Sequence, residues 1–372
     1  MNKRTLLGLL LVCAIWAPTA RSEEAAPSAL PSVGYDKGFF IETADKNFKL
    51  VLRGYLQPYF DNKFPDSRAE TRTFRIRRAR FIWSGYFFSK DVQYEVEYDW
   101  AVSKLMEASV QLVQSDALKF RFGQYHVPFS LEQAASSSTL QFVDRSIVFP
   151  FFGVSDEREP GAGFNGLLLN RRFEYNVGAF NGEGLNTLNQ NKALRYAWRF
   201  IWNVAGEHGM EFSDTKNSQK PQVALAVGGM YNDTPDPATI PAGKTTPTTT
   251  KKVTSLTADA SAKYHGLGFH AAYLSQQVNP QTGPAMDDRG FLAQAGYFVI
   301  PEKLEFGLRL AHIYAESAKD LGEYTAGVNY FFYNGHQLKL QLDYSALTVK
   351  DGLAAGKDEL DHQVRAQLQL KL

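Results

Sequence analysis

Apolar and polar residues alternate along this chain in short segments, from about residue 48 to the last residue. Residues 92–100 read Val-Gln-Tyr-Glu-Val-Glu-Tyr-Asp-Trp, and residues 364–372 alternate in the same way. A period of two indicates β-strands with one apolar and one polar face. After residue 22, no stretch comes near the run of about 18 apolar residues that a transmembrane helix needs. A membrane-spanning form of this chain must therefore be a closed β-barrel.

Three further features favour a membrane barrel over a soluble β-sandwich, which would alternate in the same way. The segments are about nine to eleven residues long, which is the length of a tilted transmembrane strand. The polar face is heavily charged, as in a water-filled lumen, and the apolar face ends in aromatic residues, as in the girdles at membrane interfaces. These aromatic residues include Tyr94, Tyr98, Trp100, Tyr196, Trp198, Trp202, Tyr324, Tyr330 and Phe332.

The segments number sixteen, so we expect an all-β fold, a 16-stranded antiparallel transmembrane β-barrel. The expected strands are 48–60, 74–87, 92–100, 105–113, 117–126, 159–169, 172–180, 195–204, 222–231, 255–264, 268–277, 290–300, 304–313, 322–332, 337–345 and 362–372. Every second gap is a short turn, as expected for the periplasmic end, except the long gap 205–221. The longest gap is 127–158, and residues 232–254 are rich in Thr and Pro, as in an exposed loop.

The N-terminus has the features of a bacterial secretory signal. Lys3 and Arg4 precede an apolar stretch, and Ala20-Arg-Ser22 fits a cleavage site. We therefore predict a signal peptide at 1–22, an N-terminal periplasmic segment at 23–47 and an outer-membrane barrel at 48–372. Cys13 is the only cysteine, so the mature chain would contain no disulfide.

The overall charge is nearly balanced, with 40 basic and 39 acidic residues and a net charge of +1, which argues against a nucleic-acid partner. Alternation places fourteen basic residues on the lumen face: Lys49, Arg53, Arg78, Arg80, Lys119, Arg121, Arg172, Arg195, Arg199, Lys263, Arg309, Lys339, Arg365 and Lys371. It places nine acidic residues there: Glu95, Glu97, Asp99, Glu107, Glu174, Asp259, Glu305, Glu323 and Asp343. This excess predicts a lumen that attracts anions. Alternatively, these charges pair with one another and only solvate the lumen.

The basic residues are densest in the first half of the chain. We predict that the anion pathway is formed by Arg53, Arg78, Arg80, Lys119 and Arg121, because the planar fork of arginine suits oxyanions. The neighbouring lumen carboxylates Glu95, Glu97 and Asp99 would either hold these arginines in place or neutralise them. Arg75 and Arg77 fall on the opposite phase, which indicates either a rim position or a β-bulge.

No constellation typical of an enzyme or a metal site stands out, so we predict no catalytic residues, no metal and no cofactor. The segment Gly161-Ala-Gly-Phe-Asn-Gly166 matches a dinucleotide fingerprint, but the residues after it indicate a turn between strands and not a helix. These glycines are more typical of close packing in a barrel strand. The seven histidines are scattered, and their spacing fits no common ligand motif.

Several of these segments resemble the phosphate-selective porin O and P family over about residues 37–372. The similar stretches are FKLVLRGYLQ at 48–57, FRIRRARF at 74–81, QYEVEYD at 93–99 and, most specifically, FGQYHVPFSLE at 122–132. The resemblance implies a homotrimer and passive solute uptake. It also implies an in-folded constriction loop at about 128–158, with Glu132, Gln133, Ser136, Ser137 and Ser138 in its narrow part.

One departure from that family bears on the solute. Phosphate-selective members carry lysines in the part of the loop that corresponds to residues 132–138, whereas this chain has no lysine between Lys119 and Lys192. The leading hypothesis is a passive outer-membrane pore for small hydrophilic solutes, with a weak to moderate anion preference and phosphate as one candidate. Its partners would be small anionic or polar solutes and outer-membrane lipid. The alternatives are a non-selective porin and an outer-membrane enzyme.

Overall fold

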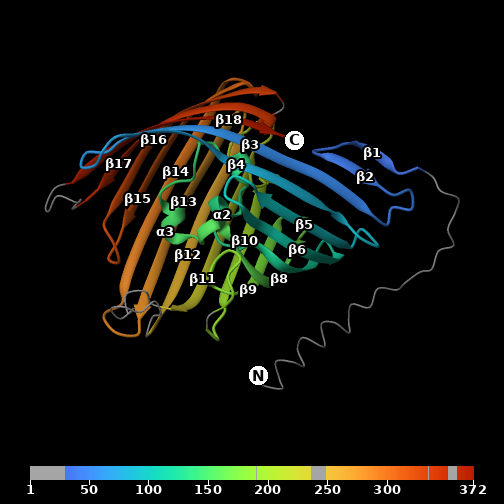
Figure 1. The fold of residues 1–372 in the computed structure, drawn as a ribbon, viewed down its shortest axis with the longest axis horizontal. Helices are drawn as coiled ribbons and strands as arrows, with labels where there is room; N and C mark the ends of the chain where they lie inside the picture. Colours follow the sequence, from blue (N-terminus) through green and yellow to red (C-terminus); the bar gives the residue numbers. More distant parts are fainter. Residues whose placement is uncertain (1–29, 190, 236–248, 334, 351–357) are drawn as a thin grey trace.

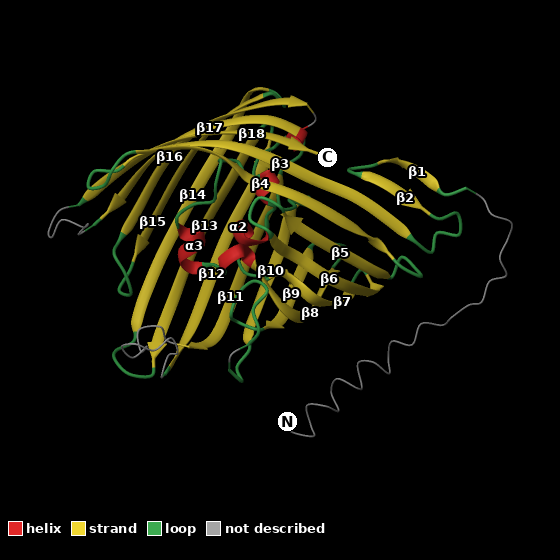
Figure 2. Cartoon of the chain, viewed as in Figure 1, coloured by secondary structure: helices red, strands yellow, loops and turns green. Residues whose placement is uncertain are grey.

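A computed structural model describes residues 30–372 except 190, 236–248, 334 and 351–357. Its sheet has eighteen strands, of which two form an N-terminal hairpin and the other sixteen close into one antiparallel barrel (Figures 1 and 2). The expected signal peptide lies outside the described residues. Each of the sixteen expected ranges coincides with one barrel strand, so the predicted fold is confirmed. Among the described residues, no helix is long and apolar enough to cross a membrane.

The barrel closes where the last strand pairs with the first, for example Lys371 with Tyr55 and His362 with Phe64. The sixteen strands are β3 (Lys49–Phe64), β4 (Thr71–Tyr86), β5 (Val92–Asp99), β6 (Lys104–Ser115), β7 (Leu118–His126), β8 (Arg158–Leu168), β9 (Phe173–Phe180), β10 (Arg195–Ala205), β11 (Gln222–Pro235), β12 (Thr250–Tyr264), β13 (Leu267–Pro280), β14 (Met286–Ile300), β15 (Leu304–Tyr314), β16 (Leu321–Tyr333), β17 (Leu338–Val349) and β18 (Glu359–Lys371).

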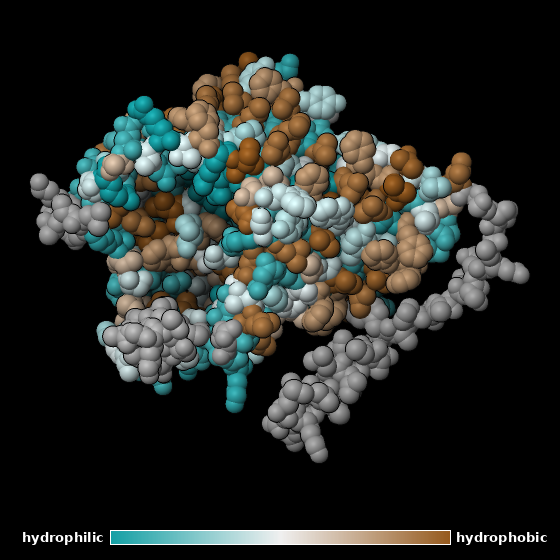
Figure 3. All heavy atoms as spheres, in the orientation of Figure 1, coloured by the Kyte–Doolittle hydropathy of each residue, from teal (hydrophilic) through white to brown (hydrophobic). Residues whose placement is uncertain are grey.

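The alternation sorts side chains between the outer surface and the lumen as expected. On β3, Leu52 and Leu56 are exposed on the outside, whereas Tyr55, Gln57 and Tyr59 are buried on the lumen side. Apolar side chains cover much of the outer wall in the view of Figure 3. In a membrane this surface would contact lipid, which explains how so many large apolar residues are exposed in one chain.

The N-terminal hairpin was not predicted from the sequence. Strands β1 (Ser32–Tyr35) and β2 (Phe39–Glu42) pair with each other, and β2 then pairs with the start of β3. Along one edge of β3, residues 49–52 pair with β2 and residues 55–64 pair with β18. The hairpin therefore continues the sheet beyond the end of the last strand, outside the closed ring.

The connection between β7 and β8 folds into the barrel. This constriction loop (residues 127–157) contains α2 (Leu131–Ala134), η1 (Ser137–Thr139), α3 (Val148–Phe152) and η2 (Ser155–Glu157), and Figure 1 shows α2 and α3 within the ring of strands. Val127 and Phe129 have no exposed surface, and α3 contacts β13, β14 and β15. The prediction of an in-folded loop is confirmed.

The long gap after β10 also folds inward, from the opposite end of the barrel. In this second loop (residues 206–221), Phe212 packs with Leu131, Ala135 and Leu140 of the constriction loop in one buried cluster. Ser213 donates a hydrogen bond to the buried Glu305, at 3.0 Å. The two loops therefore meet inside the lumen, which explains why this connection is too long for a simple turn.

Candidate functional site

Charged side chains on β15, β16 and β17 hold residues 143–147 of the constriction loop by hydrogen bonds to its backbone. The carboxylate of Glu323 accepts a hydrogen bond from the backbone N–H of Ile147 at 2.8 Å, and Arg309 donates to the carbonyl of Asp144 at 2.9 Å. Asp343 accepts from the backbone N–H of Val143 at 3.0 Å. These contacts give the loop backbone the hydrogen-bond partners that burial demands.

Asp144 of the constriction loop is the point where the arginines of β4 meet the loop. Arg77 and Arg78 both donate to its carboxylate, each at 3.1 Å. Burial alone would raise the pKa of Asp144, but the guanidinium groups of Arg78 and Arg77 outweigh it and hold this pKa below its ordinary value. Arg77 reaches the lumen because it is the extra residue of a β-bulge, since Gln57 pairs with Arg78 and Pro58 pairs with Ile76. The sequence left a rim position and a β-bulge as the alternatives for Arg77, and the structure has the β-bulge.

The other arginines predicted for the anion pathway also lie in the lumen, and each is paired with a carboxylate. Arg53 pairs with Glu95 at 2.6 Å. Arg80 pairs with Glu97 at 2.7 Å and with Asp99 at 2.9 Å. Arg121 pairs with Glu107. Two of the predicted lumen carboxylates, Glu97 and Asp99, thus hold one buried arginine between them.

Lys119 differs from these arginines. Its side chain lines a lumen cavity, and within the described residues it has neither an ion pair nor a hydrogen bond. Of the five residues predicted for the anion pathway, it is therefore the one whose charge no neighbouring carboxylate offsets at short range. Arg75 is similar, because it lies over the ring of Tyr59 at 5.1 Å and has no ion pair among the described residues.

The sequence alone did not reveal three further charged residues of the lumen, which are Arg145, Glu157 and Arg158. Arg158, at the start of β8, pairs with Glu97 at 3.0 Å and with Glu157 at 3.0 Å. Arg145 pairs with Glu157 at 2.6 Å and also donates to the carbonyl of Ala135 at 2.7 Å. These residues lie in or beside a loop without periodicity, so alternation carried no information about them.

Most of the residues expected in the narrow part of the constriction loop shape the loop itself. Glu132 accepts hydrogen bonds from the backbone N–H of Ser146 at 3.0 Å and from its hydroxyl at 2.6 Å. Gln133 is fully buried and donates to the carbonyl of Val127 at 2.6 Å. Ser136 is exposed.

Ser137 and Ser138 are buried, whereas the family resemblance places them in the narrow part of the loop, which lines the pore. Their carbonyl groups accept hydrogen bonds from Gln57 at 3.4 Å and from Gln369 at 3.0 Å. The difference arises because the loop packs directly against the wall at this point, which no sequence spacing indicates.

The opening on the long-loop side of the constriction loop is strongly charged. This outer cavity has a volume of about 350 Å³ and includes Arg78, Asp144 and Ile147 in its lining. Its charged lining comprises five arginines (Arg77, Arg78, Arg80, Arg145 and Arg365) and four carboxylates (Asp144, Asp156, Glu157 and Glu323). The outer cavity therefore carries a small positive excess within a dense network of ion pairs.

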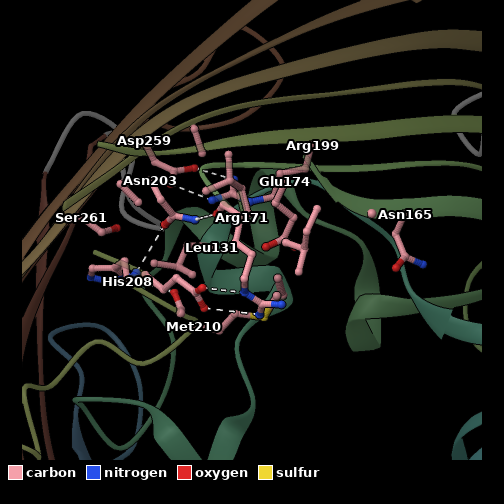
Figure 4. Close-up of a pocket in the computed structure, with 18 of the residues that line it drawn as sticks. Leu131, Asn165, Arg171, Glu174, Arg199, Asn203, His208, Met210, Asp259 and Ser261 are labelled. Carbon is pink, nitrogen blue, oxygen red and sulfur yellow. Dashed lines mark hydrogen bonds and ion pairs between the residues drawn. The ribbon is translucent and has the colours of Figure 1, made fainter. Parts of the chain in front are cut away.

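The opening on the short-turn side is lined by both charged and apolar side chains, among them Arg171, Glu174, Leu131 and Met210 (Figure 4). It consists of two cavities, of about 300 Å³ and 230 Å³, which share Ala134, Glu174, Arg199, Ile201 and Met210 and so form one inner passage. Its charged lining comprises four basic residues (Lys119, Arg121, Arg171 and Arg199) and three carboxylates (Glu174, Glu207 and Asp259). His126 of the inner passage lies 4.0 Å from Glu157 of the outer cavity, so the two openings adjoin there.

Glycines on the lumen face mark the positions where the two loops lie against the wall. A Cβ atom on Gly228 would lie 2.4 Å from the carbonyl oxygen of Phe129, and one on Gly268 would lie 2.2 Å from that of Phe212. The glycines of the dinucleotide-like segment have the packing role that we expected, because a Cβ atom on Gly163 would lie 2.7 Å from the hydroxyl of Tyr125. Glycines on the lumen face were thus the sequence signal that could have located the loops.

Comparison with known families identifies the fold. The model of the family described as phosphate-selective porin O and P matches residues 53–372. The chain belongs to this porin family. A comparison with curated protein sequences finds no match. Across the described residues, no group of three or more His, Cys, Asp or Glu side chains is placed to hold a metal ion.

Solved structures similar to this porin are outer-membrane channels. The anion-selective porin from Comamonas acidovorans has a TM-score of 0.63 and 11% identity, over 87% of this chain and 99% of its own. OmpT of Vibrio cholerae, in a trimer form, has a TM-score of 0.59 and 14% identity, over 87% and 99%. OmpF of Salmonella typhi has a TM-score of 0.56 and 12% identity, over 92% and 100%.

These findings settle the class and location of the protein. The family match and the closed 16-stranded barrel make it a porin of the bacterial outer membrane, and hence a channel protein. In such barrels the short turns face the periplasm and the longer loops face outward. The outer cavity therefore opens toward the exterior and the inner passage toward the periplasm.

Proposed function

We propose that this porin lets small hydrophilic solutes diffuse passively and prefers anions weakly. The observation that supports this most directly is the charge of the two openings. The outer cavity has five basic residues against four acidic ones, and the inner passage has four against three. Each solute that crosses would meet a small positive excess on both sides of the constriction, and in a narrow lumen even a few charges change local ion concentrations.

The same pairing argues that the preference is weak. Arg78 and Arg80 are buried and bound to carboxylates, so their fields are largely cancelled at short range. Lys119 has no such partner among the described residues, so we expect it to contribute more to the anion preference than any one of the paired arginines. The lysines of phosphate-selective relatives are absent from the constriction loop, so we do not assign phosphate as the solute.

We further propose that the functional unit is a homotrimer. The support comes from OmpT of Vibrio cholerae, which is similar in fold and is described in a trimer form. Native mass spectrometry of the detergent-extracted protein tests this proposal. A mass of one subunit under conditions that keep the barrel folded would contradict it.

The test of selectivity is the reversal potential of the purified porin in a planar bilayer with a potassium chloride gradient. We expect a potential of the sign for chloride preference, and a shift toward zero in Lys119→Gln. The matched control is Lys303→Gln, which removes an exposed lysine from a turn outside the lumen. A reversal potential of zero in the wild type would favour the alternative, a non-selective porin on the same scaffold.

A further inference from the structure

The inner passage has a feature that a channel for inorganic ions does not require, because one of its walls is apolar. Ala134 and Leu131 of the constriction loop, Met210 of the second loop and Ile201 of β10 line it together. Tyr125 and Val127 continue this wall toward the constriction. Met210 keeps 43% of its surface exposed where it lines the passage.

Strand β7 supplies two of the cationic groups of the passage. Lys119 and Arg121 are two residues apart on β7 and therefore share a face of the strand. Lys119 has no partner among the described residues, whereas Arg121 is engaged by Glu107 and Ser109. Arg121 also lies 5.1 Å from the ring centre of Tyr125, so the cationic and apolar walls meet there.

Two polar atoms of residues that line the passage have unused hydrogen-bonding capacity. The hydroxyl of Tyr125 and the Nε of Arg199 are buried and have no hydrogen-bond partner among the described residues. A buried donor without a partner is unfavourable. Arg199 lines the same cavity as Lys119, so a carboxylate held there would approach it, whereas Tyr125 lies six residues from Lys119 along β7, about 20 Å away. Both residues line the passage, which makes a bound solute a suitable partner.

Glu174 limits the charge that a solute can carry here. Its carboxylate lines both cavities of the passage and accepts a hydrogen bond from Asn176 at 3.0 Å, and it has no basic partner among the described residues. A second negative charge on the solute would meet this carboxylate, and repulsion between like charges is strong in a narrow lumen. The passage therefore suits one negative charge better than two.

We infer that the inner passage selects monovalent organic anions with an apolar body, such as short aliphatic carboxylates, over inorganic dianions such as phosphate. The carboxylate lies beside Lys119, and the hydrocarbon part lies against Ile201 and Met210. This inference rests on the proposed function, since it names the solute class of a channel that prefers anions weakly. The apolar contact makes longer carboxylates bind more tightly, because each buried methylene adds a similar free energy.

The experiment uses the full porin in planar bilayers, with acetate, butyrate or hexanoate added to potassium chloride on the periplasmic side. We expect the concentration that halves chloride conductance to fall by about two- to fourfold for each added methylene, and phosphate to block less than hexanoate. Met210→Gln reduces the dependence on chain length and leaves the effect of acetate unchanged. Met286→Gln, at the long-loop end of β14, is the matched control and keeps the wild-type series.

The outcomes separate this inference from the proposed function. If all three carboxylates block equally while the reversal potential still indicates chloride preference, the apolar subsite is wrong and the weakly anion-preferring channel stands. If the reversal potential indicates cation preference, the proposed function itself fails. Lys119→Gln should weaken the block by acetate and hexanoate by the same factor, and a loss confined to hexanoate would also contradict the assignment.

Discussion

The outer cavity and the inner passage belong to one lumen but are built by different means. In the outer cavity, arginines from β4 meet Asp144 of the constriction loop, Arg365 of β18 pairs with a carboxylate of β17, and Glu323 of β16 pairs with an arginine of β15, so nearly every charge has a partner. In the inner passage, apolar residues from two loops line the lumen together with Lys119, which has no ion pair among the described residues. The outer cavity therefore fixes the position of the constriction loop, while the inner passage leaves contacts unused and available to a solute.

The strongest test of this comparison removes the constriction loop, because it separates the two openings. Replacing residues 131–152 with a short Gly-Ser linker should increase single-channel conductance severalfold, since α2 and α3 lie inside the ring of strands. Planar-bilayer recording measures the effect, and heat-modifiable mobility on a gel verifies that the barrel still folds. An unchanged conductance in a folded barrel would show that this loop does not limit the flow of ions.

Phe212→Ala should have a smaller effect, because it changes only the inner passage. The ring of Phe212 is buried against the constriction loop and lies edge-on to His270, with ring centres 5.3 Å apart. Removing a buried aromatic ring costs about 3–5 kcal/mol, which should free the second loop and raise conductance. The matched control is Phe306→Ala on the outer surface, where the side chain is 52% exposed. An equal effect of both substitutions on conductance would contradict the role given to the second loop.

The sequence predicted the wall of both openings but not their interior. Period-two alternation placed Arg53, Arg80 and Lys119 in the lumen, because each strand has only two faces. The same rule put Arg77 on the opposite phase and left a rim position or a β-bulge open, and the structure has the bulge, in which one extra residue reverses the phase. Asp144 could not be found in this way, because a loop has no period that predicts which side chains meet which strands.

The partners of the lumen charges were equally beyond the sequence. Alternation left open whether the carboxylates hold the arginines in place or neutralise them, and distances of 2.6–2.9 Å now show close pairing for Arg53 and Arg80. One feature of the sequence does indicate where the loops lie. It is the presence of glycines, such as Gly228 and Gly268, at strand positions that face the lumen. These glycines become informative only once the alternation has been used to assign the lumen face.

Acidic pH should act on the inner passage before it acts on the outer cavity. Burial, with a further contribution from Lys263, lowers the pKa of His208 in the second loop to about 4, below its ordinary value of about 6.5. The packed loop is therefore fully stabilised above pH 6.5 and loses stability as the pH falls toward 4, because the released loop binds a proton that the packed loop does not. Asp144, whose pKa lies below its ordinary value, should stay ionised through this range.

The measurement is single-channel conductance between pH 7 and pH 4. We expect conductance to rise in the wild type as the second loop loosens, and to change less in His208→Gln, which cannot gain this charge. Other carboxylates begin to titrate near pH 4, so the difference between the two proteins is the relevant quantity. An identical pH profile for both would indicate that His208 does not control the packing of the second loop.

The smallest expected effect concerns the ion pair of Arg53 and Glu95, which lies toward the periplasmic side of the barrel. The pair is closed at 2.6 Å but partly exposed, with side-chain exposures of 36% and 30%, so water and salt screen both charges. Glu95→Gln removes one negative charge while Ser84 still accepts a hydrogen bond from Arg53 at 3.1 Å, which keeps the guanidinium in place. The reversal potential in a potassium chloride gradient should therefore shift slightly further toward chloride preference. Arg53→Gln should shift it by a similar amount in the opposite direction, and the double substitution should restore the wild-type value. If both single substitutions shift the potential in the same direction, the pair influences selectivity through the shape of the lumen and not through its charge.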